Sequence, residues 1–98
     1  MRKYIITYWI RNVGENYSPF YEAIKANFPD HTHPQENLWI VRSDDTARRI
    51  ADRIKPFMKD NDSLFVSEIT DDHAGWMPKT MWEWMLECTT KEIKERRG

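Results

Sequence analysis

The triplet Asp71-Asp72-His73 contains the residue types in this sequence that look most like a catalytic group. Two carboxylates at the end of a strand can collect a hard cation such as Mg²⁺, and an imidazole can act as a base near neutral pH. The next residues are Ala74-Gly75, and aspartates placed before such a break commonly cap the backbone of a turn. The triplet therefore has two readings, a candidate catalytic site and ordinary turn chemistry.

The pair His31-x-His33 places two imidazoles on the same face if this segment is extended. Three histidines can bind Zn²⁺, and His73 is the third histidine of the chain. Pro34 follows the pair at once, however, and nothing in the sequence brings His73 close. The pattern favours a polar surface segment over a metal site. We expect no metal and no cofactor, with Mg²⁺ required only if the protein is a nuclease.

Four arginines, with Lys55, form the richest basic cluster. The arginines are the candidates for nucleic-acid binding: Arg42, Arg48, Arg49 and Arg53. Neighbouring guanidinium groups can hold phosphates through paired hydrogen bonds. An aspartate stands four residues before each of Arg48 and Arg49, which is the favourable order for ion pairs within a helix. These aspartates, Asp44 and Asp45, would neutralise much of the charge, so a solvated helix face is the alternative.

Three tryptophans near the C-terminus could form a base-stacking platform or an interface anchor: Trp76, Trp82 and Trp84. Trp84 shares a helical side with Met81 and Met85, so it is expected to face the core. Trp82 lies about 200° of helical rotation away from Trp84, so one of the two must leave that side. An extra tryptophan on a second face of a small protein suggests a partner surface. We therefore take Trp76 and Trp82 as the interface candidates.

The composition predicts one soluble domain and argues against several classes of protein. The chain has 98 residues, of which 40% are hydrophobic and 32% charged, and its net charge of −1 does not suit a generically basic nucleic-acid binder. Cys88 is the single cysteine, which excludes an internal disulfide. The longest apolar run is far shorter than the ~20 residues of a membrane span, and no secretory cleavage site follows the N-terminus. We expect a cytoplasmic protein with no membrane partner.

Hydrophobic periodicity predicts strands over Lys3 to Ile10, Asn37 to Arg42 and Ser63 to Thr70. Helices are expected after Ser18-Pro19, after a cap at Ser43-Asp44-Asp45, and from Pro78. The middle helix carries an apolar stripe that includes Phe57 and Met58. The segment from Asp30 to Glu36 fits either a loop or an irregular edge strand.

With a second strand in that segment, the order becomes strand, helix, two strands, helix, strand. This is an α+β fold, a ferredoxin-like βαββαβ sandwich with an additional C-terminal helix. Residues 1–88 are expected to form the single domain, and residues 89–98 a charged C-terminal tail.

Three segments in this order resemble a known family: Tyr4-Ile5-Ile6-Thr7-Tyr8, Leu38-Trp39-Ile40-Val41-Arg42-Ser43 and Asp60-Asn61-Asp62-Ser63-Leu64-Phe65-Val66. The likeness extends to Gly75-Trp76 and Trp82-Glu83-Trp84, so it covers roughly residues 3–87. The chain is similar to the SinR-like family of small bacterial proteins. That family is related to the CRISPR-associated adaptation endoribonucleases and, more distantly, to VapD-type toxins.

The resemblance implies a ferredoxin-like fold that dimerises through its sheet. In the nuclease relatives, an acidic residue at the end of the first strand pairs across the dimer and holds a divalent metal. The family pattern at this place is Tyr followed by Asp, whereas this chain has Tyr8 followed by Trp9. An indole cannot coordinate Mg²⁺, which takes oxygen ligands. The family's metal-dependent cleavage is therefore not transferred to this position.

The leading hypothesis is a homodimeric, non-catalytic module of this nuclease-related family, with a binding role toward nucleic acid or a partner protein. One alternative is a metal-dependent endoribonuclease of toxin type that has moved its acids to Asp71 and Asp72. Another is an acidic phage- or plasmid-borne inhibitor that mimics nucleic acid. Its mimic surface would use three acidic pairs: Asp44-Asp45, Asp60/Asp62 and Asp71-Asp72.

Overall fold

A computed structural model describes residues 1–10 and 18–86 of the chain. The predicted loop from Arg11 to Tyr17, the residue Cys88, the proposed domain end at residue 88 and the tail 89–98 lie outside the described residues. A final helical segment covers residues 79–86. The other elements, in chain order, are β1 (Arg2–Trp9), α1 (Ser18–Asn27), β2 (His31–Gln35), β3 (Leu38–Ser43), α2 (Ala47–Ile54), the 3₁₀ helix η1 (Lys55–Phe57) and β4 (Ser63–Ile69).

The four strands form one sheet in the order β2-β3-β1-β4, and every neighbouring pair is antiparallel. The segment left open by the sequence is an edge strand, β2. Its pairing with β3 shifts register between Thr32 and Gln35, and the strand contains Pro34, as an edge position allows. The architecture is α+β and is compatible with a ferredoxin-like fold.

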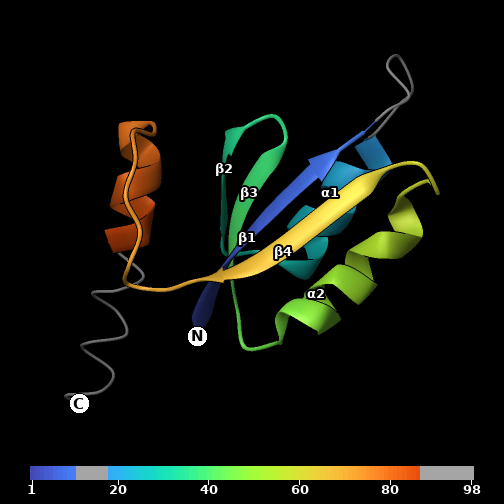
Figure 1. The fold of residues 1–98 in the computed structure, drawn as a ribbon, viewed down its shortest axis with the longest axis horizontal. Coiled ribbons are helices and arrows are strands. Elements are labelled where there is room, and N and C mark those ends of the chain that lie inside the picture. The colour runs from blue at the N-terminus through green and yellow to red at the C-terminus, as the bar shows by residue number, and fades with distance from the viewer. Residues whose placement is uncertain (11–17, 87–98) are drawn as a thin grey trace.

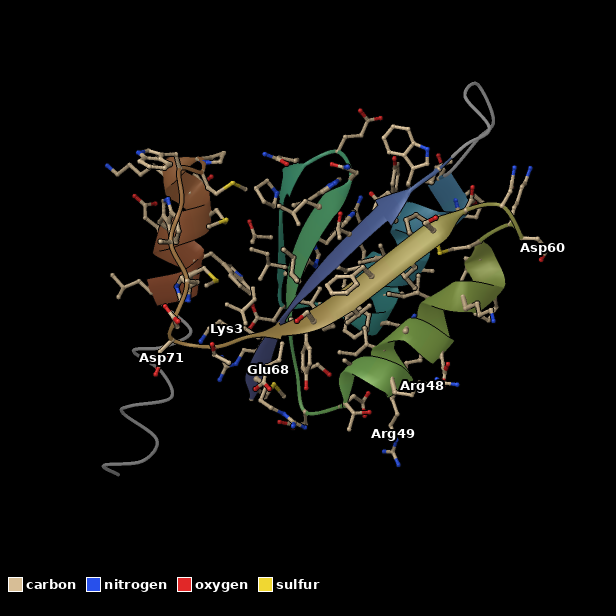
Figure 2. All side chains as sticks on the ribbon, in the orientation of Figure 1. Lys3, Arg48, Arg49, Asp60, Glu68 and Asp71 are labelled. Atoms are coloured by element: carbon tan, nitrogen blue, oxygen red, sulfur yellow. The ribbon has the colours of Figure 1, made fainter. Side chains whose placement is uncertain are left out.

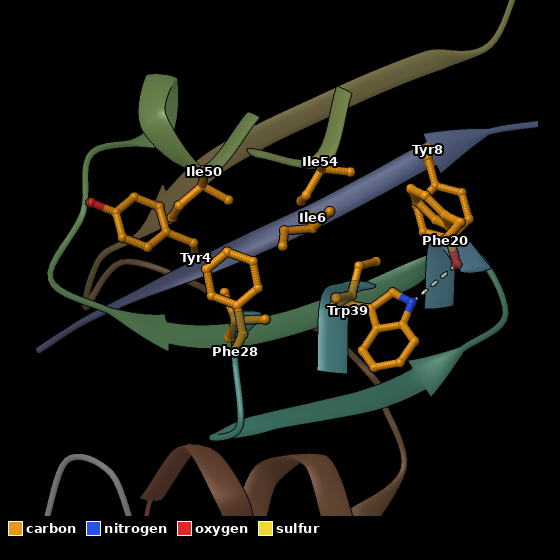
Figure 3. Close-up of a cluster of buried hydrophobic side chains, with 10 residues drawn as sticks. Tyr4, Ile6, Tyr8, Phe20, Phe28, Trp39, Ile50 and Ile54 are labelled. Atoms are coloured by element: carbon orange, nitrogen blue, oxygen red, sulfur yellow. Dashed lines mark hydrogen bonds between the residues drawn. The ribbon is translucent and has the colours of Figure 1, made fainter. Parts of the chain in front are cut away.

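The main core lies between the sheet and the two helices α1 and α2, which cover the same face (Figure 1). Alternation along β1 turns Tyr4, Ile6 and Tyr8 into this core. Strand β3 adds Trp39 and Val41 from its position beside β1 (Figure 3). The helices complete the cluster with Phe20, Ile24, Phe28, Ile50 and Ile54.

The beginning and end of α2 differ from the sequence-based prediction. Its N-cap is Thr46, whose side-chain oxygen accepts a hydrogen bond from the backbone N–H of Arg49, and not the preceding Ser43-Asp44-Asp45. The regular helix ends at Ile54 because Pro56 has no N–H to continue the ladder, and a 3₁₀ turn follows. That change of pitch leaves Phe57 48% exposed, so its predicted place in the buried stripe is wrong.

The helical segment 79–86 packs on the other face of the sheet and forms a second, smaller cluster. Met81 and Met85 are buried there against Ile40 of β3. In Figure 1 this segment stands on the β2 side of the molecule, away from α1 and α2. Among the described helices, none is long and apolar enough to cross a membrane.

Candidate functional site

The sheet face turned away from α1 and α2, called here the open face, carries alternate side chains of β3, β1 and β4. The strand register arranges these side chains in rows that run across the sheet. From one end to the other, the rows are Trp9–Ser63, Leu38–Thr7–Phe65, Ile40–Ile5–Ser67 and Arg42–Lys3–Ile69.

The two ends of the open face differ in how they are covered. Residues 77–86 pack over Ile40 and Ile69 at one end. At the other end, Trp9 is 63% exposed and Phe65 is 62% exposed. Thr7 pairs with Phe65 in the β1–β4 ladder, so Trp9 and Phe65 are diagonal neighbours on one face, within reach of aromatic side chains.

The bare end, called here the aromatic end, consists of Thr7, Trp9, Ser63 and Phe65. All four side chains are uncharged. They line a shallow depression of about 270 Å³ that also touches Asn37. The hydroxyl of Thr7 donates a hydrogen bond to the Asn37 carbonyl at 3.0 Å. This surface offers apolar and aromatic contact, and it contains no group that transfers protons near neutral pH.

Trp9 is the last residue of β1, which is where the family resemblance expects an acidic metal ligand. In the structure the indole lies on the open face and not in the core, because the adjacent Tyr8 points to the helices. The sequence identified the substitution, but the alternation of apolar residues on both sides of β1 could not show that the Trp9 side is bare.

The candidate catalytic triplet forms a turn on the surface, where Asp71, Asp72 and His73 are all exposed. The backbone N–H of His73 donates to the Asp71 carbonyl at 3.1 Å, and its Nδ1 donates to the Thr70 carbonyl. The ring of His73 stacks on Trp82, with centroids 6.2 Å apart and planes 14° apart. The hydrogen bonds of His73 thus serve its own turn.

The two histidines of β2 share a side, as expected for an extended segment. Both rings lie against Trp39, with centroid distances of 5.2 Å for His31 and 3.8 Å for His33. One nitrogen of each ring donates to a backbone carbonyl, at Phe28 and Glu36 respectively. Within residues 1–10 and 18–86, no group of three or more His, Cys, Asp or Glu side chains is placed to hold a metal ion.

The predicted four-arginine cluster is divided between the two sides of the sheet. Arg48, Arg49 and Arg53 lie on α2, where Figure 2 shows the first two directed outward. Arg42 alternates with the core residue Val41 and therefore belongs to the open face. The structure does not bring Arg42 together with the other three.

Acidic partners neutralise the arginines of α2, as the sequence indicated, although with one different pairing. Asp45 lies 2.7 Å from Arg53 and 3.9 Å from Arg49. Arg48 pairs with Asp52 at 3.3 Å and not with the predicted partner, Asp44.

The acidic pairs proposed for a nucleic-acid mimic do not gather on one surface. Asp60 and Asp71 lie at opposite ends of β4 (Figure 2). Asp45 is occupied by two arginines. The charge pattern is therefore divided among separate parts of the molecule.

The interface candidates Trp76 and Trp82 have different environments. Trp76 is 98% exposed. Trp82 and Trp84 both pack against the Ile40–Met81–Met85 cluster, so neither indole leaves it as helical spacing predicted. The reason is tertiary, since His73 stacks on Trp82 and Asp30 accepts a hydrogen bond from Trp84 Nε1 at 3.1 Å.

Phe65 is the surface residue that sequence reasoning missed. The pattern placed it with Ile69 opposite Leu64 and Val66, but both sides of this strand are apolar. Only the position of residues 77–86, which stop short of Phe65, shows which side chains stay exposed.

Comparison of the chain with protein-family models, curated proteins and solved structures finds no match. The resemblance to the SinR-like family stays a prediction from the sequence.

Proposed function

We propose that this protein is a homodimeric, non-catalytic module with a ferredoxin-like fold, related to the nuclease family that its sequence resembles. Its role is assembly or regulation, and the aromatic end of the open face is the surface that contacts a second copy. The observation that carries the proposal is the 63% exposed Trp9 at the last position of β1. An apolar side chain stands there, where the relatives are expected to keep an acid.

The chemistry of the aromatic end supports a protein partner better than a nucleic acid. Aromatic residues are enriched and charged residues depleted at the centres of protein interfaces. Nucleic-acid affinity depends instead on Lys and Arg beside the phosphates. The aromatic end has no such residue, and the arginines of α2 lie on the other side of the sheet in ion pairs.

A second copy suits this surface because homodimers commonly use one self-complementary patch related by a two-fold axis. Trp9 and Phe65 are diagonal neighbours, so a two-fold axis between them sets the indole of each copy against the phenyl ring of the other. Both rings are then removed from water, which is favourable in proportion to the apolar area buried.

Sedimentation velocity over a range of protein concentrations tests the proposal. We expect the wild type to dimerise, and Trp9→Ala and Phe65→Ala each to weaken dimerisation about tenfold or more, as the loss of a central aromatic anchor does. The matched control is Phe57→Ala, which removes a 48% exposed phenyl ring from η1. This control should leave the dimer unchanged.

Two results would contradict the proposal. If the wild type stays monomeric at every concentration, the proposed dimer and its contact surface are wrong. If the purified protein cleaves RNA in a Mg²⁺-dependent way and Trp9→Ala retains this activity, the non-catalytic assignment is wrong.

A further inference from the structure

The cover segment, residues 77–86, is attached to the molecule differently from the rest of the fold. Its buried methionines Met81 and Met85 belong to the small cluster on Ile40, which is separate from the main core. The chain that leads to it, residues 70–76, is exposed throughout. A segment with few buried apolar contacts of its own is the kind that opens locally without global unfolding.

A polar contact ties the cover segment to the sheet beside this cluster. Trp84 Nε1 donates to Asp30 Oδ1 at 3.1 Å, and Asp30 Oδ2 lies 3.6 Å from an Arg42 nitrogen. The backbone N–H of Arg42 also donates to the Asp30 carbonyl at 3.0 Å. Asp30 therefore links the indole of the cover to the strand beneath it.

The burial of Arg42 in this contact is unfavourable and opposes the hydrogen bond. The Arg42 side chain is only 9% exposed, and among the described residues its buried Nε has no hydrogen-bond partner. A buried guanidinium with an unmade hydrogen bond is unfavourable, and access of water relieves that cost. Arg42 shares a row of the open face with Ile69, which packs against the cover. We therefore expect opening of the cover to lose the Trp84–Asp30 bond and to give water access to Arg42.

The surface beneath the cover is continuous with the aromatic end. Ile40 pairs with Ile5 across β1 and β3, and Ile5 precedes Thr7 on the same face of β1. Ile40 is 3% exposed in the closed arrangement. Removal of the cover would extend the apolar surface from the aromatic end to Ile40.

We propose that the cover segment is a displaceable lid that limits self-association, an inference that rests on the proposed function. In the closed state only the aromatic end contacts a second copy. In the open state Ile40 and Ile69 join the contact surface, and the dimer becomes tighter.

Amide hydrogen exchange and sedimentation velocity on the full chain test the lid. Trp84→Phe keeps a ring against the cluster but removes the donor to Asp30. We expect exchange of the amides in residues 79–86 to accelerate about fivefold, as the loss of one net hydrogen bond does. Exchange in β1 should not change, and the dimer dissociation constant should fall by up to the same factor.

The matched control is Trp82→Phe, which removes an indole N–H on the same segment and leaves the bond to Asp30 in place. It loses ring packing as Trp84→Phe does, so only the acceleration of exchange by Trp84→Phe in excess of this control reports the bond to Asp30. Arg42→Leu is the variant of opposite sign, because it removes the buried guanidinium and leaves Asp30, 43% exposed, in water. It should slow exchange in residues 79–86, and it decides the question if Trp84→Phe does not fold.

Three results would overturn the lid. The first is that the amides of residues 79–86 exchange only together with those of β1. The second is that Trp84→Phe accelerates exchange in residues 79–86 without strengthening the dimer. The third is that Arg42→Leu accelerates this exchange instead of slowing it. A wild type that never dimerises has a different meaning. It overturns the proposed function, and the regulatory role of the lid with it, whereas a wild-type dimer unaffected by these variants overturns the lid alone.

Discussion

Trp39 Nε1 donates a 3.0 Å hydrogen bond to the hydroxyl oxygen of Tyr8 inside the core, and this bond joins β3 to β1 (Figure 3). The Tyr8 hydroxyl in turn donates to the Glu36 carbonyl. Its ring meets Phe20 edge-on, with centroids 4.7 Å apart. Tyr8 therefore links the sheet, α1 and the β2–β3 turn from the position just before Trp9.

Replacement of Tyr8 by phenylalanine should destabilise the fold by about 1–3 kcal/mol, because it leaves the buried Trp39 N–H without its acceptor. Chemical denaturation at neutral pH measures this change. The control is a double-mutant cycle with Trp39→Phe, in which the two losses should not add. Strictly additive losses would show that the hydrogen bond contributes nothing to stability.

The same tyrosine predicts a loss of stability in alkali. Burial raises the pKa of the Tyr8 phenol above its ordinary value, mainly through desolvation and against the lowering effect of the hydrogen bond from Trp39. The folded protein thus keeps this proton when the unfolded chain releases it near pH 10. The contribution of Tyr8 is complete below about pH 10 and decreases as the pH rises further, by up to about 1.4 kcal/mol per pH unit.

Denaturation of the wild type and Tyr8→Phe between about pH 7 and pH 12 measures this contribution, since the other tyrosines are common to both proteins. The stability gap between the two should narrow above about pH 10. A gap that stays constant over the whole range would contradict the prediction.

Burial of α2 against the sheet predicts a large effect at Ile50, which is 0% exposed. Ile50→Ala should cost about 2–5 kcal/mol of unfolding free energy, from lost burial and the cavity left behind. The adjacent Arg49→Ala, at a side chain that is 75% exposed, should stay within about 0.5 kcal/mol of the wild type. Similar losses in the two variants would mean that α2 does not pack as described.

The ion pairs of α2 predict how the protein responds to polyanions. Asp45→Asn releases Arg49 and Arg53, whereas Asp52→Asn releases only Arg48. Both substitutions change the net charge equally, so a larger gain in heparin retention for Asp45→Asn reflects the local cluster. The slope of log affinity for heparin against log salt concentration should steepen by about two for Asp45→Asn and by about one for Asp52→Asn. Equal retention of the two variants would contradict this assignment.

The exposed turn at the end of β4 allows a direct test of the relocated nuclease site. The double variant Asp71→Ala/Asp72→Ala should melt at the wild-type temperature, because both side chains are exposed. Under the non-catalytic proposal, neither the wild type nor the double variant should cleave RNA in the presence of Mg²⁺. Loss of a measurable RNA cleavage at an unchanged melting temperature would instead favour the toxin-type endoribonuclease.

The sequence by itself determined which residues share a face within each element. Alternation placed Tyr4, Ile6 and Tyr8 on one side of the first strand, and helical spacing grouped Phe20 with Ile24; all five are buried in the main core. These predictions succeed because the periods of 2 and 3.6 residues are local properties of the backbone.

Only the tertiary structure decided which faces are covered and which distant residues meet. The open face is apolar along much of its length, so periodicity cannot show that Ile40 is covered while Trp9 is bare. The contact of Trp84 with Asp30 joins residues 54 positions apart, and the separation of Arg42 from the helix arginines depends on where α2 packs. Such relationships come from the packing of whole elements against one another, which the local pattern of any one segment does not encode.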